Sequence, residues 1–251
     1  MWWHGEVTTA ERASEPITDA STATARQERA ERVATSRGGR LFYRLFHLFI
    51  RVVLFRYFRV RRRGAEHLAT PGPLILAPVH RSNLDAPLVA GMASRSTRAL
   101  GKESLFKAGP LGWIMCSLGG FPVHRGAADR QSMRVAEQLL ADGAALFVFP
   151  EGSRQSGDEV ADIFDGPAFL AARTGAKVVP IGIAGTEAAM PPGSRFPRRG
   201  RCAVVVGEPM DPPDTGGGGR LSMSQRKAYT EALRANLQRV FDEAQAEAEQ
   251  L

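Results

Sequence analysis

Two residues that could do acid–base chemistry lie in the stretch LILAPVHRSNLDAP, residues 74–87, where Asp85 follows His80 by five positions. On one ideal helix their side chains would point roughly 140° apart. An apolar strand that ends before His80, followed by a helix that begins near Ser82, instead lets the imidazole fold back toward the first helical turn. A carboxylate on one ring nitrogen fixes the tautomer and leaves the other nitrogen to accept a proton. The spacing is therefore compatible with a general base held by a carboxylate.

The same segment also has a purely structural interpretation. Residues Ser82 to Asp85 have the form S-x-x-D, a capping-box variant in which Asp85 accepts backbone amides at the start of a helix. In that case His80 would have no functional role beside Asp85. Helix caps are commoner than catalytic pairs, so this segment alone leaves both interpretations open.

A second apolar run ends in polar residues in ALFVFPEGSRQSG, residues 145–157. Ligands of open α/β sheets bind outside the carboxyl ends of the strands, so we expect His80 and the group Glu151 to Arg154 to face the same crevice. The alternative is an ordinary glycine-containing turn with solvated charges.

The region between these two stretches, residues 101–126, carries cations around an apolar run. Lys102, Lys107 and Arg125 could bind a phosphate, and the run from Leu111 to Gly120 could line an apolar slot. Equally, the run could be a buried helix and the cations could be surface residues.

Composition limits the class of protein. The chain has 251 residues and 43% hydrophobic residues, enough for one substantial core. A formal net charge of +7 indicates an anionic partner, and residues 40–65 concentrate it with eight Arg and no acid. Cys116 and Cys202 are too few for a disulfide framework and form no zinc motif, which fits a reducing compartment.

The N-terminal part divides into two segments. Residues 1–38 have no apolar signal-peptide core, and their composition predicts a disordered tail. Residues 39–64 combine helical apolar periodicity with arginines and aromatic rings, and no uninterrupted apolar stretch is long enough to span a bilayer. This pattern predicts an amphipathic helix at an anionic membrane surface, ending in Arg61 to Arg63. The alternative is a surface helix packed on the protein's own core.

The remaining residues, 65–251, alternate between strand-like and helix-like runs. Expected strands cover residues 74–79, 144–149, 178–183 and 202–206. Expected helices cover residues 83–93, 128–141 and 165–174, and a further helix carries the apolar stripe Tyr229, Leu233, Leu237, Val240 and Phe241. The alternation predicts an α/β domain with a mainly parallel sheet flanked by helices.

Four motifs in order carry a resemblance to a known family: HRSNLD, then GKESLF with GGFPVHRG, then FPEGSR, then VVPIGIAG. Together they resemble the glycerolipid acyltransferases of the 1-acylglycerol-3-phosphate acyltransferase type, with their H-x-x-x-x-D motif. Three positions depart from the family pattern: Val79 stands in place of the usual Asn, His124 in place of an acidic residue, and Ser153 in place of Thr.

The resemblance implies roles for particular residues. His80 would be the general base and Asp85 the carboxylate that orients it. The substrate-binding residues, which would shape a site for the acceptor phosphate, would be Lys102, Arg125, Glu151, Gly152, Ser153 and Arg154. No metal or other cofactor is implied.

The implied reaction is acyl transfer to lysophosphatidate from a thioester of coenzyme A or of an acyl carrier protein. A thioester is already activated, so the reaction needs a base, oxyanion donors and positioning, and no enzyme nucleophile. Neither cysteine has the cationic, polar surroundings of a reactive thiol. The expected location is the cytoplasmic face of the cell membrane, peripheral or monotopic.

Other functions remain open at this point. The acceptor could be glycerol 3-phosphate, another lysolipid or a glycolipid, and a thioesterase would use a similar site. A non-catalytic membrane-binding module would not need His80, Asp85 and Glu151 together. Arginines interleaved with Leu, Phe and Val suit a lipid interface better than a nucleic-acid duplex, so no nucleic-acid partner is expected.

Overall fold

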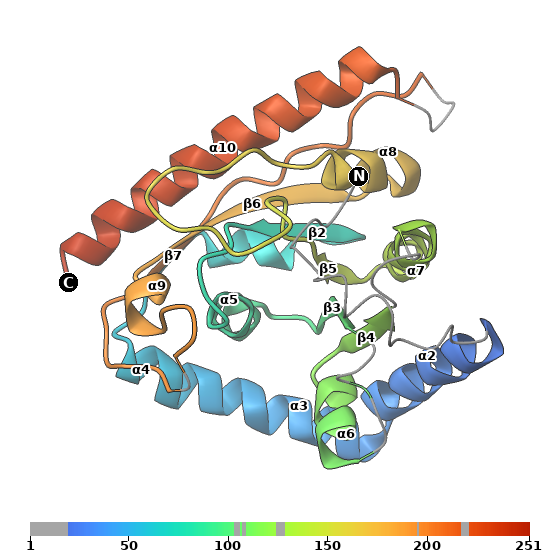
Figure 1. The fold of residues 1–251 in the computed structure, drawn as a ribbon, viewed down its shortest axis with the longest axis horizontal. Coiled ribbons are helices and arrows are strands. Elements are labelled where there is room, and N and C mark those ends of the chain that lie inside the picture. Colours follow the sequence, from blue (N-terminus) through green and yellow to red (C-terminus); the bar gives the residue numbers. More distant parts are fainter. Residues whose placement is uncertain (1–19, 103–105, 107–108, 124–128, 195, 217–220) are drawn as a thin grey trace.

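The centre of the molecule is a sheet of seven strands in the order β1-β7-β6-β2-β5-β3-β4 (Figure 1). The computed structural model describes residues 20–102, 106, 109–123, 129–194, 196–216 and 221–251. The strands are β1 (Arg61–Arg63), β2 (Leu74–Pro78), β3 (Thr97–Lys102), β4 (Gly120–Val123), β5 (Ala145–Phe147), β6 (Lys177–Ala184) and β7 (Ala203–Val206). All neighbouring strands pair in parallel except β6 and β7. The predicted α/β class with a mainly parallel sheet is confirmed.

Helices cover both faces of this sheet (Figure 1). The α-helices are α2 (Ala20–Thr35), α3 (Arg37–Phe49), α4 (Phe55–Tyr57), α5 (Asp85–Met92), α6 (Pro110–Ser117), α7 (Asp129–Ala141), α8 (Gly166–Thr174), α9 (Thr186–Ala189) and α10 (Met223–Glu249). A π-helical turn, η1 (Ile50–Leu54), joins α3 to α4, and a 3-10 turn, η2 (Ala65–Ala69), follows β1. Helices α7, α8 and α10 lie over one face, and α5 with the segment α3–α4 lies over the other.

Strand β2 lies at the centre of the sheet and is buried on both faces. All five of its residues are buried, which explains why its sequence is a continuous apolar run rather than an alternating one. Ile75 belongs to the core cluster that includes Leu140 of α7, whereas Leu76 belongs to the cluster that includes Leu88 of α5. This burial makes the carboxyl end of β2 a rigid support for His80.

The expected strands and helices of residues 65–251 are found within two residues of their predicted ends. Strands β1, β3 and β4 were not predicted. β1 and β4 are the two edges of the sheet, and β4 contains Gly120 and Pro122, which weaken a strand signal. The run from Leu111 to Gly120 does not form one element, because α6 ends at Ser117 and β4 begins at Gly120.

The prediction of a disordered tail up to residue 38 is wrong for its second part. Residues 20–35 form helix α2, in which Ala30 is fully buried, and α2 packs against α6 and β4. Its alanine, arginine and glutamate content favours a helix as much as disorder, and the packing partner decides between them. Residues 1–19 lie outside the described residues.

The segment predicted as one helix, residues 39–64, is interrupted by a π-turn. The backbone N–H of Phe55 donates to the carbonyl of Ile50, five residues earlier, where an α-helix would use the fourth. The extra residue turns Phe55 and Phe58 into the core together with Ile50. The alternative of a helix packed on the protein's own core is therefore correct for this face of the segment.

The opposite face of the same segment is exposed and apolar. Its side chains are 45% to 60% exposed, and they recur at helical spacing. We call this surface the apolar ridge; it consists of Leu41, Leu45, Leu48, Phe49, Val52 and Val53. No described helix is both long and apolar enough to cross a membrane.

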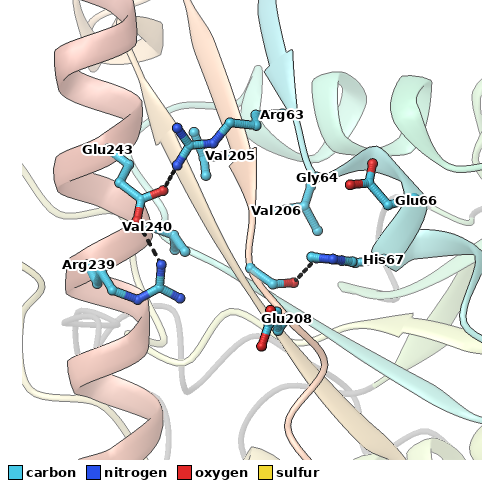
Figure 2. Close-up of a pocket in the computed structure, with 11 residues that line it drawn as sticks. Arg63, Gly64, Glu66, His67, Val205, Val206, Glu208, Arg239, Val240 and Glu243 are labelled. Carbon is cyan, nitrogen blue, oxygen red and sulfur yellow. Dashed lines mark hydrogen bonds and ion pairs between the residues drawn. The ribbon is translucent and has the colours of Figure 1, made fainter.

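The prediction that the helix continues to Arg63 is wrong, because Arg61 to Arg63 form the edge strand β1. Arg63 and Arg239 both pair with Glu243 of α10, where they line a cavity of about 400 Å³ (Figure 2). Arg61 pairs with Glu247 at 3.1 Å. Two of the eight arginines expected at a membrane surface, Arg61 and Arg63, thus pair with acids of α10.

Candidate active site

His80 and Asp85 meet in the loop between β2 and α5. His80 follows the last residues of β2, and Asp85 is the first residue of α5. Nδ1 of His80 lies 3.1 Å from Oδ2 of Asp85. The strand–turn–helix geometry expected from the spacing of five is present.

The carboxylate of Asp85 is completely buried and accepts further hydrogen bonds. Oδ2 also accepts the backbone N–H groups of Arg81 and Ser82, each at 2.7 Å, and Oδ1 accepts the hydroxyl of Thr186 at 2.7 Å. The helix begins at Asp85, so the complete S-x-x-D capping box does not form, and only its bond from the Ser82 N–H to Asp85 is present. Asp85 therefore both ties the turn together and holds the imidazole, and the two interpretations of the sequence are compatible.

The ring of His80 is packed on one side and open on the other. It lies against Phe149, with 4.0 Å between ring centroids, and its side chain keeps 20% exposure. Because Nδ1 contacts Asp85, Nε2 is the ring nitrogen left for a substrate, and no described residue is hydrogen-bonded to it. A ring fixed by a carboxylate with one free nitrogen has the geometry that general-base catalysis needs.

Glu151 was expected to help shape a phosphate site, and its contacts show a different role. Its carboxylate accepts Nη1 of Arg81 at 2.9 and 2.8 Å, the backbone N–H of His80 at 2.8 Å, and that of Ala161 at 3.1 Å. Glu151 is buried and its lone pairs are engaged by the protein's own donors. It therefore joins the loop after β5 to the loop after β2 and has no free capacity for a ligand.

Arg81 is the second member of this buried pair, and the sequence did not single it out. Besides Glu151, its guanidinium donates to the carbonyls of Gly157 and Glu159 and lies 4.7 Å from the ring centroid of Phe241. Thr186 was also missed. It stands directly after the motif VVPIGIAG, and that adjacency was the available signal.

The other residues of the FPEGSR stretch differ in exposure. Gly152 is buried with φ of 72°, and a Cβ there would lie 2.5 Å from Phe164 Cε2, so the turn needs a glycine. Ser153 and Arg154 are exposed. The backbone N–H of Gln155 donates to the carbonyl of His80 at 2.8 Å, which places Arg154 next to the His80 loop in the chain.

Two predicted phosphate ligands are not placed by the structure. Lys102 is the last residue of β3, at the same edge of the sheet as the end of β2, but its side chain is outside the described part. Arg125 lies outside the described residues, as do Lys107 and His124.

Both cysteines are buried, and neither has the properties of a nucleophile. Burial, and to a smaller extent the negative charge of Asp85, raises the pKa of the Cys202 thiol to about 12. Burial also raises the pKa of Cys116. Within the described residues, no three His, Cys, Asp or Glu side chains are grouped as metal ligands would be.

The fold and this site define a class of protein: an α/β domain that presents a carboxylate-held imidazole at the carboxyl end of a central parallel strand. The match to a family model is consistent with that class. Residues 59–184 match the model described as Acyltransferase, so the chain belongs to the acyltransferase family. The family resemblance noted from the four motifs is confirmed.

Curated relatives carry one shared description. The chain is 29% identical over 178 residues to the chloroplastic 1-acyl-sn-glycerol-3-phosphate acyltransferase of Arabidopsis thaliana, which covers 67% of this chain and 50% of that protein. It is 25% identical over 186 residues to the 1-acyl-sn-glycerol-3-phosphate acyltransferase of Bacillus subtilis, covering 73% and 89%. The chain thus spans about half the length of the plant relatives that it matches and most of the bacterial one.

A solved structure has the same fold. It is the 1-acyl-sn-glycerophosphate (LPA) acyltransferase of Thermotoga maritima, with a TM-score of 0.66 and 24% identity. The match covers 89% of this chain and 88% of that one, so the two chains share most of their fold.

Proposed function

We propose that this protein transfers a fatty acyl group from an acyl thioester to the free hydroxyl of lysophosphatidate, giving phosphatidate. The observation that carries the proposal is the 3.1 Å contact between His80 Nδ1 and Asp85 Oδ2, which leaves Nε2 unbonded at the end of β2. The printed names of the relatives in plants and bacteria support the same acceptor. The donor thioester is carried by coenzyme A or by an acyl carrier protein.

The proposed reaction needs one proton relay and no covalent enzyme intermediate. His80 Nε2 takes the hydroxyl proton of the acceptor as its oxygen forms a bond to the thioester carbonyl carbon. The C–S bond then breaks, and the imidazolium returns the proton to the departing thiolate. Asp85 stabilises the transient imidazolium, and its contact to Nδ1 holds the ring through both steps.

The acceptor's phosphate is proposed to bind exposed cations beside the His80 loop. Arg154 is exposed one residue before Gln155, whose backbone bonds to His80. A guanidinium can donate two parallel hydrogen bonds to a phosphate, which positions as well as attracts it. Lys102 and Arg125 remain proposed partners in this site, whereas Glu151 is assigned to holding the loops.

The apolar ridge is proposed to hold the protein on an anionic membrane. Phosphatidate and lysophosphatidate carry acyl chains that reside in a bilayer, so the site must work at its surface. Leucine and phenylalanine side chains would enter the acyl boundary, while exposed arginines of the same segment, Arg37, Arg40, Arg44 and Arg56, would lie among headgroups. Attachment at the cytoplasmic face, without a nucleic-acid partner, stays a prediction.

The test is an acceptor and donor panel with the purified protein on anionic vesicles. Lysophosphatidate, glycerol 3-phosphate and lysophosphatidylcholine are each offered with acyl-coenzyme A or acyl carrier protein, and both acylated product and free fatty acid are measured. Phosphatidate formation that exceeds transfer to the other acceptors supports the proposal. Free fatty acid as the main product would identify a thioesterase, and preferred transfer to glycerol 3-phosphate would identify a different acceptor.

A further inference from the structure

A cavity lined by arginines lies near the amino ends of the central parallel strands, whereas His80 follows the carboxyl end of β2. It has a volume of about 460 Å³ and is bounded by α3, by the loop between α5 and β3, and by the turn between α6 and β4. Thr97, in its wall, aligns through Ala145 of β5 with Leu74 of β2. His80 lies six residues further along that strand direction, roughly 20 Å away at about 3.3 Å per residue.

The described residues in the wall of this cavity carry positive charge only. Arg40, Arg44, Arg95 and Arg98 line it, and none of the described lining residues is an aspartate or glutamate. The cavity in Figure 2 is different, because Glu66, Glu208 and Glu243 offset its arginines. Like charges gathered without a counter-charge repel one another, so an anion bound between them would stabilise the folded state.

Three of these arginines are available to a ligand. Arg95 donates to the backbone carbonyls of Thr70, Gly72 and Gly143, which fixes it as part of the wall. The guanidinium groups of Arg40, Arg44 and Arg98 have no hydrogen-bond or ion-pair partner among the described residues.

A buried hydroxyl in the same wall also lacks a partner. Ser117 is only 2% exposed, and its Oγ makes no hydrogen bond in the described structure. Unsatisfied buried hydroxyls are rare because each loses its bonds to water without replacement. Ser117 lines the cavity but its Oγ is itself buried, so a rotation of the side chain toward a ligand oxygen would give this O–H group an acceptor.

The cavity adjoins the apolar ridge on helix α3. Arg40 and Arg44 each stand one residue before a ridge leucine, Leu41 and Leu45. A lipid whose chains lie along the ridge would thus bring its headgroup to the mouth of the cavity. The four arginines select a doubly charged oxyanion over a neutral headgroup.

We propose that this cavity binds a phosphate group, at a site separate from the acyl-transfer site. The phosphate is either the headgroup of an anionic phospholipid or a soluble phosphate. Arg44 and Arg98 would bind its oxygens, and Ser117 would donate to one of them.

The first experiment compares two double variants of equal charge. Arg44→Ala with Arg98→Ala removes two cavity arginines, while Arg37→Ala with Arg56→Ala removes two exposed arginines of the same segment that do not line the cavity. Binding is measured by flotation with phosphatidate-containing and purely phosphatidylcholine vesicles, and by the phosphate-dependent rise in Tm at constant ionic strength. Both variants lose two charges that attract anionic headgroups, but hydrogen bonds to charged groups are strong, so the cavity variant should lose at least about tenfold more affinity than the control.

The outcomes separate the two sources of phosphate. A cavity-specific loss on phosphatidate vesicles alone identifies a lipid headgroup, and a cavity-specific loss of the inorganic-phosphate effect identifies a soluble ligand. Equal losses in both double variants, or no cavity-specific loss in either assay, would overturn the proposal. Flotation and Tm measure binding and not enzyme activity, so the result does not depend on the proposed acyl transfer.

A single substitution provides an independent check. Ser117→Ala removes a buried hydroxyl that has no partner, so the Tm of the ligand-free protein should stay the same or rise. The rise in Tm caused by inorganic phosphate or phosphatidate should become smaller. An unchanged ligand-induced shift would show that Ser117 does not touch the anion and would contradict the proposed site.

Discussion

Nη1 of Arg81 donates to both carboxylate oxygens of Glu151, at 2.9 and 2.8 Å, with side chains that are 2% and 0% exposed. The two residues come from different motifs, and Glu151 also accepts the backbone N–H of His80. The FPEGSR stretch therefore positions His80 through a buried ion pair and a hydrogen bond to its backbone.

Glu151→Gln should lower the free energy of unfolding substantially. The substitution keeps the shape but leaves Arg81 as an uncompensated buried charge, which typically costs about 3–5 kcal/mol. Urea unfolding measures the change. Glu137→Gln is the control, because its pair with Arg173 is partly exposed and should contribute less than about 1 kcal/mol. Similar small losses in both variants would show that Glu151 does not support the fold.

His80→Ala should abolish most acyl transfer while the protein stays folded. General-base catalysis contributes about 10²–10⁴-fold, and no second imidazole is bonded to Asp85 among the described residues. Initial rates of phosphatidate formation and the urea midpoint are measured on the same preparation. A variant with near-normal kcat would remove His80 from the mechanism.

Arg154→Ala should mainly raise the KM for the acceptor. If its guanidinium binds the acceptor phosphate with paired hydrogen bonds, Arg154→Lys should recover only part of the loss. Steady-state kinetics in which the acceptor and the thioester are varied in turn show which of the two substrates Arg154 binds. A selective rise in the KM of the thioester would place Arg154 at the donor instead.

The apolar ridge should control membrane attachment. Replacing Leu41, Leu45 and Leu48 by Ser should weaken binding to anionic vesicles roughly hundredfold, at about 1 kcal/mol for each partly inserted side chain. Met223→Ser, at an exposed residue of α10, should have no effect on binding. Phe55→Ala should lower stability by about 3–5 kcal/mol instead, because Phe55 is buried. Unchanged flotation of the triple variant would place the membrane contact elsewhere.

Stability should fall at alkaline pH partly through Cys202. Its folded pKa of about 12 exceeds the ordinary value of 9.0, so the unfolded thiol ionises first. This contribution to stability is complete below pH 9 and is lost as the pH rises toward 12, by up to about 1.4 kcal/mol per pH unit. Burial also raises the pKa of Tyr229, so the comparison must be between wild type and Cys202→Ala. Parallel stability curves for the two proteins would contradict the shift.

The sheet could be predicted from the sequence where its strands are buried. Leu74 to Pro78 form a continuous apolar run because β2 is buried on both faces. Ala203 to Val206 form another, and β7 is buried throughout and packs against α10. Strand β3 carries Thr97, Arg98 and Lys102, and its pattern does not differ from that of a polar loop. Its strand conformation comes from pairing with β5 and β4, which is not a local property of the sequence.

The site could be predicted only in part for a related reason. The contact between His80 and Asp85 could be expected from their spacing, because a strand end and a helix start leave few geometries for five residues, but the spacing alone did not distinguish a catalytic pair from a helix cap. The partner of Glu151 is Arg81, 70 residues away in the chain, and the partner of Asp85 is Thr186, 101 residues away. Such long-range hydrogen bonds leave no spacing signal in a single sequence.

The π-turn at Ile50 to Leu54 has a consequence for how the molecule can sit on a flat surface. A helical wheel with about 100° per residue places Phe55 close to Leu41 and Leu48, on the outside. The extra residue of the π-turn instead places Phe55 in the core directly after the ridge. This contact holds helix α3 in one rotational orientation relative to the sheet. On the proposed lipid surface, the fold would therefore set the tilt and depth of the protein, and with them the height of His80 above that surface.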